Sequence, residues 1–276
     1  MTRQTILGIF FPISICLLSA CASYRSTATS KLFQQIYYRN IQTRSFFDSP
    51  QKIAVVSISD SDKLKGTWGM AYRRDTLIKT SEFASNEQQA DVAINGGFFD
   101  MQKGGSVTYL EVDDTVINYT IDEKERWAKA SPIVNGALII NKNNRIEIEP
   151  NRKAAHYQSS RREKAVFVTG PLLLHRGKRT PLGSTDFIHK RHPRSCVCVT
   201  TDQTTLLIAV DGRQDDAAGM SLPELQEYLL LNKCRDAINL DGGGSTTLWI
   251  KEQGIVNSPS DKTGERPVAN VLYFRQ

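Results

Sequence analysis

AINLDGGGSTTLWI, residues 237–250, places three consecutive glycines and three hydroxyl residues between two apolar strand patterns. Glycine loses more conformational freedom on folding than any other residue, so such a run indicates a backbone that turns tightly or lies against a ligand. Free backbone N–H groups in a turn of this kind can form a concavity that binds anions. Asp241 adds a carboxyl group directly before the glycines. The stretch therefore predicts a strand–turn–strand unit that carries a functional site, with a purely structural turn as the alternative.

Two familiar nucleotide-binding loops do not fit this glycine run. A phosphate loop needs Gly-x-x-x-x-Gly-Lys-Ser/Thr, and a dinucleotide loop needs Gly-x-Gly-x-x-Gly, each at the start of a helix. The run contains no lysine, and Thr246 to Ile250 is β-branched and aromatic, which is typical of a strand. Nucleotide binding of either kind is therefore not predicted.

The N-terminus carries a targeting signal. Arg3 is followed by an apolar run from Ile6 to Leu18 and by Leu-Ser-Ala-Cys at 18–21. A run this short is typical of a signal peptide and not of a membrane span. The Leu-Ser-Ala-Cys stretch resembles the bacterial lipobox, which predicts a lipoprotein signal peptide at 1–20 and lipidation of Cys21; an ordinary signal peptide is the alternative. We therefore expect a lipid-anchored protein of the bacterial cell envelope. Residue 22 is Ala and not Asp, so where there are two membranes we expect the protein in the outer one.

The remaining chain is expected to form a tether at 21–49 and one domain at 50–276. Without residues 1–20 it holds 34 basic and 29 acidic residues. This mild excess of positive charge suits an anionic substrate or a membrane surface. No interleaved aromatic and basic motif supports nucleic-acid binding. Three cysteines remain after Cys21, namely Cys196, Cys198 and Cys234. Their spacing fits neither a disulfide framework nor a zinc site, so we interpret them as buried thiols and leave open one disulfide to Cys234.

Strand patterns outnumber helix patterns along the domain. We expect α+β architecture, with a mixed, mostly antiparallel sheet core, a few packed helices and a single catalytic domain. Helices are predicted at 80–90, with Ser81 as cap, and at 221–232, where Ser221 and Glu224 form a capping box. Residues 151–164 are predicted as loop, and the basic segment 175–194 as a solvated loop or a lid over an anionic ligand. The predicted strands are 52–59, 91–94, 107–112, 115–119, 136–140, 145–148, 165–168, 172–174, 196–200, 204–210, 237–241, 246–250 and 268–274.

Polar residues stand beside glycine at three predicted strand ends, at 95–97, 211–213 and 241–245. Sites are commonly built on such loops, so we expect the three turns to converge. One cleft would then hold the carboxyl groups of Asp241 and Asp211 and the guanidinium of Arg213. Two carboxyl groups can divide the acid, base or nucleophile roles of glycoside cleavage, and arginine binds phosphate bidentately. This combination predicts a hydrolytic site for a charged sugar ester.

At these turns the sequence resembles the phosphodiester glycosidase family. The matching motifs are AINGGFF at 93–99, HPRS at 192–195, VDGR at 210–213, GMSLPEL at 219–225 and NLDGGGSTT at 239–247. The resemblance implies an α+β catalytic domain that hydrolyses the bond between the anomeric carbon of a sugar and phosphate. It departs at 195–198, where Ser-Cys-Val-Cys replaces the more usual Thr and small apolar residues, and over 150–190, which matches little.

The resemblance also implies site residues. Asp241 is the first candidate for the acid/base or nucleophilic carboxylate, with Asp211 as its partner, and Arg213 and Arg194 would hold the phosphate. We expect substrate contacts from Asn95, Gly96, Gly97, Gly242, Gly243, Gly244, Ser245 and Thr246. No cofactor is expected, although the residue types leave open a divalent cation at Asp211 and Asp241. Two alternatives remain: an envelope lipoprotein that binds glycans or phosphoglycans without catalysis, and a purely structural lipoprotein.

Overall fold

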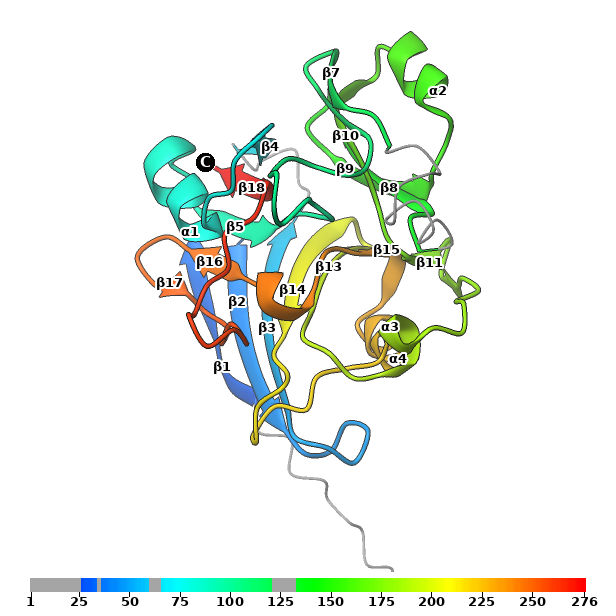
Figure 1. Ribbon diagram of the computed structural model, residues 1–276. Coiled ribbons are helices and arrows are strands. Elements are labelled where there is room, and N and C mark those ends of the chain that lie inside the picture. Colours follow the sequence, from blue (N-terminus) through cyan, green and yellow to red (C-terminus); the bar gives the residue numbers. More distant parts are fainter. Residues whose placement is uncertain (1–25, 34–35, 60–65, 121–132) are drawn as a thin grey trace, which may run out of the picture.

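Three antiparallel sheets form the molecule (Figure 1). The computed structural model describes residues 26–33, 36–59, 66–120 and 133–276. The largest sheet has eight strands in the spatial order β1 (Ser26–Phe33), β2 (Ile36–Thr43), β3 (Gln51–Ser59), β14 (Thr204–Val210), β13 (Arg194–Thr200), β15 (Cys234–Asn239), β11 (Leu172–His175) and β12 (Lys178–Arg179).

Two five-stranded sheets complete the fold. The first has the order β7 (Thr115–Asn118), β6 (Leu110–Val112), β10 (Glu163–Thr169), β8 (Gly136–Asn141) and β9 (Ile146–Pro150). The second has the order β17 (Gly254–Ile255), β16 (Leu248–Ile250), β5 (Val92–Asn95), β18 (Asn270–Arg275) and β4 (Thr67–Tyr72). One buried cluster takes side chains from all three sheets, among them Val197, Ile94 and Phe167. The sheets therefore share a common core.

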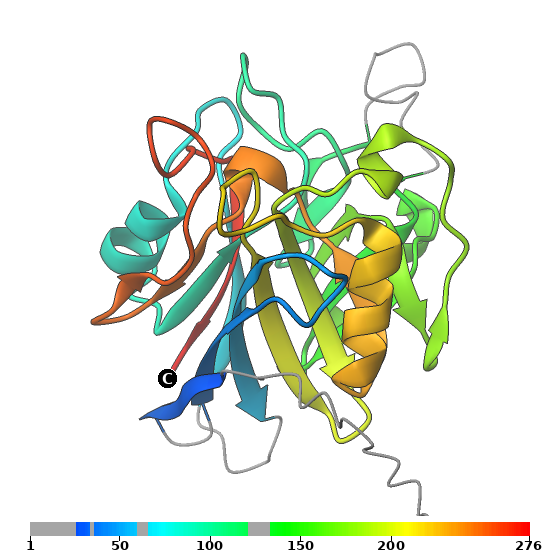
Figure 2. The same ribbon diagram turned by 90° about the horizontal axis from the view of Figure 1, so that it is seen from below.

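The helices are short and cover the outer faces of the sheets. Helix α4 (Leu222–Leu231) packs against the large sheet, on the opposite side of the molecule from α1 (Thr80–Glu82) and the π-helix η1 (Phe83–Glu87) (Figure 2). The other two helices are α2 (Ala154–Ser159) and α3 (Asp186–His189). The predicted antiparallel sheet core with few helices is confirmed, and the balance lies further toward sheet than an evenly mixed α+β fold.

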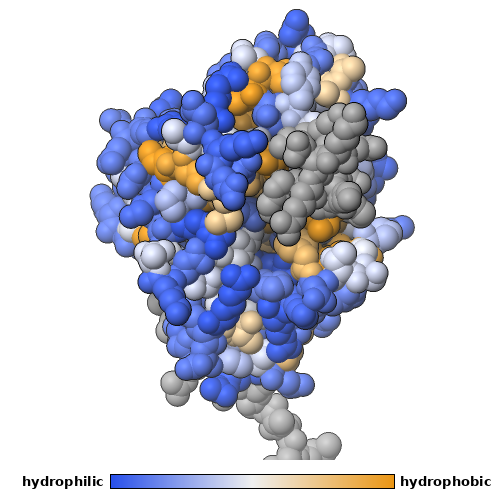
Figure 3. Space-filling view, viewed as in Figure 1, coloured by the Kyte–Doolittle hydropathy of each residue, from blue (hydrophilic) through white to orange (hydrophobic). Residues whose placement is uncertain are grey.

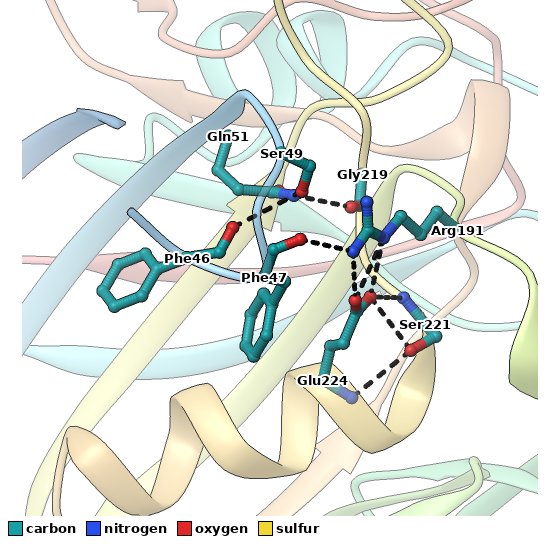
Figure 4. Close-up of polar contacts among 8 residues, drawn as sticks. All are labelled: Phe46, Phe47, Ser49, Gln51, Arg191, Gly219, Ser221 and Glu224. Atoms are coloured by element: carbon teal, nitrogen blue, oxygen red, sulfur yellow. Dashed lines mark hydrogen bonds and ion pairs between the residues drawn. The ribbon is translucent and has the colours of Figure 1, made fainter. Parts of the chain in front are cut away.

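The start of α4 follows the sequence pattern closely. The Ser221 hydroxyl accepts from the Glu224 N–H, and the Glu224 carboxylate accepts from the Ser221 N–H, which confirms the capping box. The same carboxylate pairs with Arg191, whose guanidinium also donates to the Phe47 carbonyl (Figure 4). This helix start therefore fixes the end of the basic segment 175–194 to the domain.

Several expectations for individual segments need correction. Residues 36–43 form β2, which pairs along its length with β3, so the described part of the expected tether at 21–49 extends the sheet. The expected loop 151–164 contains α2, whose Tyr157 is buried, and the first residues of β10. The helix at 80–90 changes to a π-helix after Glu82, and Ser81 bonds to Glu265 while Lys79 occupies the cap position.

The cysteine question left open by the sequence is resolved in favour of a disulfide. Cys198 in β13 is bonded to Cys234 at the start of β15, with their Cα atoms 5.8 Å apart. Cys196 is a buried free thiol, and burial raises its pKa. The disulfide therefore staples two adjacent strands whose other ends lead to the glycine turns.

The face shown in Figure 3 is mainly hydrophilic, with its apolar residues in small patches. Within the described ranges, no helix has the length and apolar character needed to cross a membrane.

Candidate active site

The three predicted turns meet at one place. The Asp241 N–H donates to the Gly96 carbonyl at 3.0 Å, and the Gly243 N–H donates to the Pro193 carbonyl at 2.9 Å. A Cβ added to Gly212 would lie 2.9 Å from the Pro193 nitrogen, so the turn at 211–213 packs against the same residue. The predicted convergence of segments near 95, 212 and 242 is confirmed. Pro193 lies between the turns at 212 and 242, and the segment near 95 is bonded directly to Asp241.

Asp241 is the carboxyl group at the centre of this arrangement. Its side chain is half-buried, and its Oδ1 accepts from the Gly242 N–H at 3.0 Å. Burial raises the pKa of Asp241 to about 6, against the opposing effects of the Ser245 hydroxyl, the positive charge of Arg266 and the Gly242 N–H. A carboxyl group with such a pKa changes its protonation state close to neutral pH, which is the property of a general acid or base.

The glycine run is required because charged side chains lie against its backbone. Gly243 has a φ of +61°, and a Cβ there would lie 3.2 Å from the Arg213 guanidinium. A Cβ on Gly244 would lie 2.2 Å from both Asp261 and Arg266, which form a bidentate ion pair at 2.7 and 2.9 Å. The glycines therefore admit two guanidinium groups next to Asp241. The sequence analysis missed Asp261 and Arg266, because the loop that carries them has only an ordinary charged composition.

Arg213 is placed to receive an anion. Its side chain is exposed, its φ is +61°, and its Nη2 lies 3.4 Å from His192 Nδ1. No carboxylate of the described residues lies within ion-pair distance of Arg213. Burial, Arg194 and Arg213 lower the pKa of His192, so its imidazole stays neutral at neutral pH. The positive charge of Arg213 beside Gly243 remains available to a ligand.

Asn95 does not have the predicted substrate-binding role. Its side chain is fully buried, and its Nδ2 donates to the carbonyls of Asp241 at 2.7 Å and Gly96 at 3.1 Å. Its Oδ1 accepts from the Ser195 hydroxyl at 2.6 Å and the Thr247 N–H at 3.1 Å. An amide has two donors and two strong acceptor positions, and all four are occupied. Asn95 therefore fixes the turn of Asp241 to the neighbouring strands.

Arg194 also has a structural position in place of the predicted phosphate contact. It is 1% exposed, and its guanidinium donates to the backbone carbonyls of Met220, Phe187 and Lys190. Burial lowers its pKa to about 9, with a smaller contribution from the nearby charge of Arg213. Arg194 is the first residue of β13. Its buried guanidinium thus holds the carbonyl groups of Phe187 and Lys190, in the preceding part of the basic segment 175–194, against the start of this strand.

Asp211 lies at the end of β14, and the Asn257 side chain links its carboxylate to the carbonyl of Thr246, after the glycine run. It is 5% exposed, and its Oδ1 accepts from the Asn257 side chain at 3.1 Å and the Ser258 N–H at 2.8 Å. Burial raises its pKa to about 6, and the charges that act on it are those of Lys52 and Asp216. These contacts make Asp211 a positioning residue for the loop 257–258.

The remaining predicted contacts divide into two groups. A Cβ on Gly96 would meet the Asn270 side chain at 1.9 Å, and one on Gly97 would meet Phe167 at 2.4 Å, so these two glycines are required by protein packing. The hydroxyl groups of Ser245 and Thr246 are buried; that of Thr246 has no hydrogen-bond partner among the described residues, and that of Ser245 has none apart from the Asp241 carboxyl group, whose pKa it lowers. Their unused capacity lies beside Asp241, in the 3₁₀ turn η3 (Gly243–Ser245) and directly after it.

The described residues hold no group of three or more His, Cys, Asp or Glu side chains arranged to bind a metal ion.

The chain is similar to known proteins over most of its length. The family model of phosphodiester glycosidases matches residues 88–275. The N-acetylglucosamine-1-phosphodiester alpha-N-acetylglucosaminidases of Bos taurus and Homo sapiens are 25% and 26% identical to the chain in alignments of 227 positions that cover 71% of the chain. The chain spans 37% of the length of the bovine enzyme and 38% of that of the human enzyme.

Solved structures show the same fold. The catalytic domain of zebrafish N-acetylglucosamine-1-phosphodiester alpha-N-acetylglucosaminidase, auto-inhibited by its pro-peptide, superimposes with a TM-score of 0.68 at 20% identity over 92% of this chain and 88% of that domain. A hypothetical protein from Synechocystis gives a TM-score of 0.66 at 15% identity over 91% of this chain and 63% of that protein. With the family model matched over most of the domain, the chain belongs to the phosphodiester glycosidase family.

Proposed function

We propose that the protein is a hydrolase that cleaves the sugar–phosphate glycosidic bond of a sugar-1-phosphodiester or a related envelope glycan. The observation that carries the proposal is the position of Asp241, with its raised pKa, on a glycine turn that the exposed guanidinium of Arg213 contacts. Family membership supports the same reaction class, and the names of the bovine and human relatives specify an N-acetylglucosamine-1-phosphodiester as their substrate.

In this proposal Asp241 acts as an ionised carboxylate. The bond between the anomeric carbon and the bridging oxygen breaks, and the phosphomonoester leaves with the electron pair. Arg213 stabilises the negative charge that collects on the departing phosphate. Water supplies the new hydroxyl group at the anomeric carbon, and Asp241 accepts its proton. A phosphomonoester leaves more readily than an alcohol, so this mechanism does not require a second carboxyl group as acid.

Product analysis tests this function. The full chain in detergent is incubated with a panel of sugar-1-phosphodiesters that differ in sugar, anomeric configuration and aglycone. The expected products are a free reducing sugar and a phosphomonoester. Saturable binding without products would instead support the non-catalytic glycan-binding lipoprotein. Neither binding nor cleavage across the panel would leave only the structural alternative.

Arg213→Ala tests the phosphate contact. Because a charge-assisted hydrogen bond to phosphate contributes about 1.5–3 kcal/mol, we expect kcat/KM to fall about 10- to 100-fold, with kcat lowered because the contact strengthens as charge collects on the departing phosphate. Stability should hardly change, since the side chain is exposed and the alanine keeps a Cβ at the same φ. Arg161→Ala, at an exposed arginine that pairs with Asp114, is the matched control. An unchanged kcat/KM in the Arg213 variant would remove this residue from the phosphate site.

We also propose that Cys21 is lipidated and anchors the enzyme in the cell envelope. Residues 1–25 lie outside the described residues, so the support comes from the sequence signal and from the Cys198–Cys234 disulfide. Disulfides persist in oxidising compartments outside the cytosol. We expect mass spectrometry of the mature protein to find a diacylglyceryl group on an N-terminal Cys21. An unmodified Cys21 in a protein that still carries residues 1–20 would contradict the anchor.

A further inference from the structure

A cavity lies at the end of β15 that is farther from Asp241. Its volume is about 410 Å³, and its lining includes Val199 at the end of β13 and Arg235 and Asp236 at the start of β15. Asp241 follows Asp236 by five positions of extended chain, which corresponds to about 16 Å. The cavity is therefore distinct from the proposed active site but shares its supporting strands.

A single buried carboxylate organises one wall of this cavity. Asp236 is 5% exposed, and its Oδ1 accepts from the Arg176 N–H at 2.7 Å and lies 3.1 Å from His175 Nδ1. Its Oδ2 accepts from Arg235 Nε at 2.7 Å. A buried charge is costly unless it is paired and hydrogen-bonded, and here these partners supply that compensation. Asp236 thus holds three residues with basic side chains at the rim.

The turn that carries Arg176 is fixed in an unusual conformation. Arg176 has a φ of +52°, which residues other than glycine rarely adopt. The next residue, Gly177, donates its N–H to the Arg235 carbonyl at 2.7 Å, so the turn is tied to β15 at two points. Both central residues of this two-residue turn have a positive φ, as a type I′ hairpin turn requires, so the conformation belongs to the β11–β12 hairpin.

The acidic residues of the opposite wall are already engaged. Glu147 accepts from the Asn141 side chain, and Glu149 pairs with Arg152 at 3.0 Å. By contrast, no described carboxylate lies within ion-pair distance of Arg176. The guanidinium of Arg176 at the rim is therefore available to an anion, while the carboxylate oxygens of Glu147 and Glu149 can still accept from hydroxyl groups.

We infer that this cavity is a second binding site, which takes a sugar that bears an anionic group. Arg176 and the outer nitrogens of Arg235 would bind the anion, and Glu147 and Glu149 would accept from the sugar hydroxyls. Ile146 and Ile148 of β9, whose side chains are buried in the core, also line this wall. A uronate carboxylate and a sugar phosphate share this chemistry, and the inference does not depend on hydrolysis at Asp241.

Binding of small acidic sugars to the full chain in detergent tests the inference. Isothermal titration calorimetry is carried out with glucuronate, glucose 6-phosphate and, as the neutral control, glucose. We expect at least one acidic sugar to bind while glucose does not. Arg176→Glu should weaken that binding by about tenfold or more, because it reverses the charge at the anion position. Arg235→Gln is the second variant, and it keeps most of the side-chain volume.

Two control variants separate this cavity from the other sites. Arg179→Glu reverses the charge of an exposed arginine outside the cavity lining and should leave binding unchanged. Arg213→Ala should also leave it unchanged. The inference is overturned if glucose binds as tightly as the acidic sugars, or if both cavity variants bind like the unaltered protein. It is also overturned if Arg213→Ala abolishes binding, because the ligand then occupies the proposed active site.

Discussion

Asp241→Asn is expected to lower kcat/KM on a sugar-1-phosphodiester by at least about 10²-fold, the usual contribution of a positioned acid or base. Asparagine keeps the shape of the side chain and an oxygen that can accept from the Gly242 N–H, but it can neither take up a proton nor carry a negative charge. Steady-state kinetics at neutral pH measure the loss. Asp75→Asn, at an exposed carboxyl group, is the matched control and should retain full activity.

The same variant should be more stable than the unaltered protein at pH 7–8. The carboxyl group has a pKa of about 6 in the folded protein, above the value of about 3.9 in the unfolded chain. Below pH 4 both states are protonated and no cost arises. As the pH rises through 6 the cost of ionising the half-buried group develops in full, about 1–2 kcal/mol after allowance for its exposure. Removal of this charge should raise Tm by about 3–6 °C at pH 7.5 and by much less at pH 4.

The pH dependence of the rate identifies the active form of Asp241. If the ionised carboxylate reacts, kcat/KM of the unaltered protein should fall as the pH drops below about 6, following the pKa of this group. The residual activity of the asparagine variant should lack that step. A fall in rate above pH 6 would instead assign Asp241 the role of an acid. Unchanged kinetics in the variant would exclude Asp241 from the mechanism.

Local patterns were sufficient to predict the elements that depend on local chemistry. The Ser221–Glu224 capping box needs only residues three positions apart, and it is present in the structure. The strands that flank the glycine run were predictable because β-branched and apolar residues alternate with turn residues. Convergence of the three turns was predictable because each follows a strand of the sheet core and carries glycine next to polar residues.

Roles that depend on contacts distant in sequence were not predictable. Arg194 appeared suited to phosphate, but its guanidinium is directed at carbonyls of a segment whose path the sequence does not reveal. Asp261 and Arg266 became part of the site only through contact with Gly244. The strand at 36–43 was assigned to a tether because its polar composition hides its pairing with β3. In each case the type of residue was known from the sequence, but the distant residue that it contacts was not.

Asn95→Ala is expected to destabilise the protein by about 3–5 kcal/mol, because buried polar groups left without partners each cost about 1–3 kcal/mol and some relax. The alanine would leave unpaired the Ser195 hydroxyl, the Thr247 N–H and the Asp241 carbonyl, while the Gly96 carbonyl would keep only its bond from the Asp241 N–H. Thermal unfolding should show Tm lower by about 10 °C or more. Asn143→Ala, at an exposed asparagine in the β8–β9 turn, should change stability by less than about 0.5 kcal/mol.

Asn95→Asp distinguishes this structural role from the substrate contact predicted by the sequence. An ionised aspartate would face the carbonyl oxygens of Asp241 and Gly96 with no donor, whereas a protonated aspartate restores one donor to them. Its pKa in the folded protein should therefore lie above the unfolded value, and the variant should lose stability as the pH rises from 5 to 8. A substrate contact requires the opposite pattern, with stability close to that of the unaltered protein at every pH and a change confined to KM. Because all four hydrogen bonds of Asn95 are made within the protein, we expect stability and kcat to fall together, since the turn that positions Asp241 loses its support.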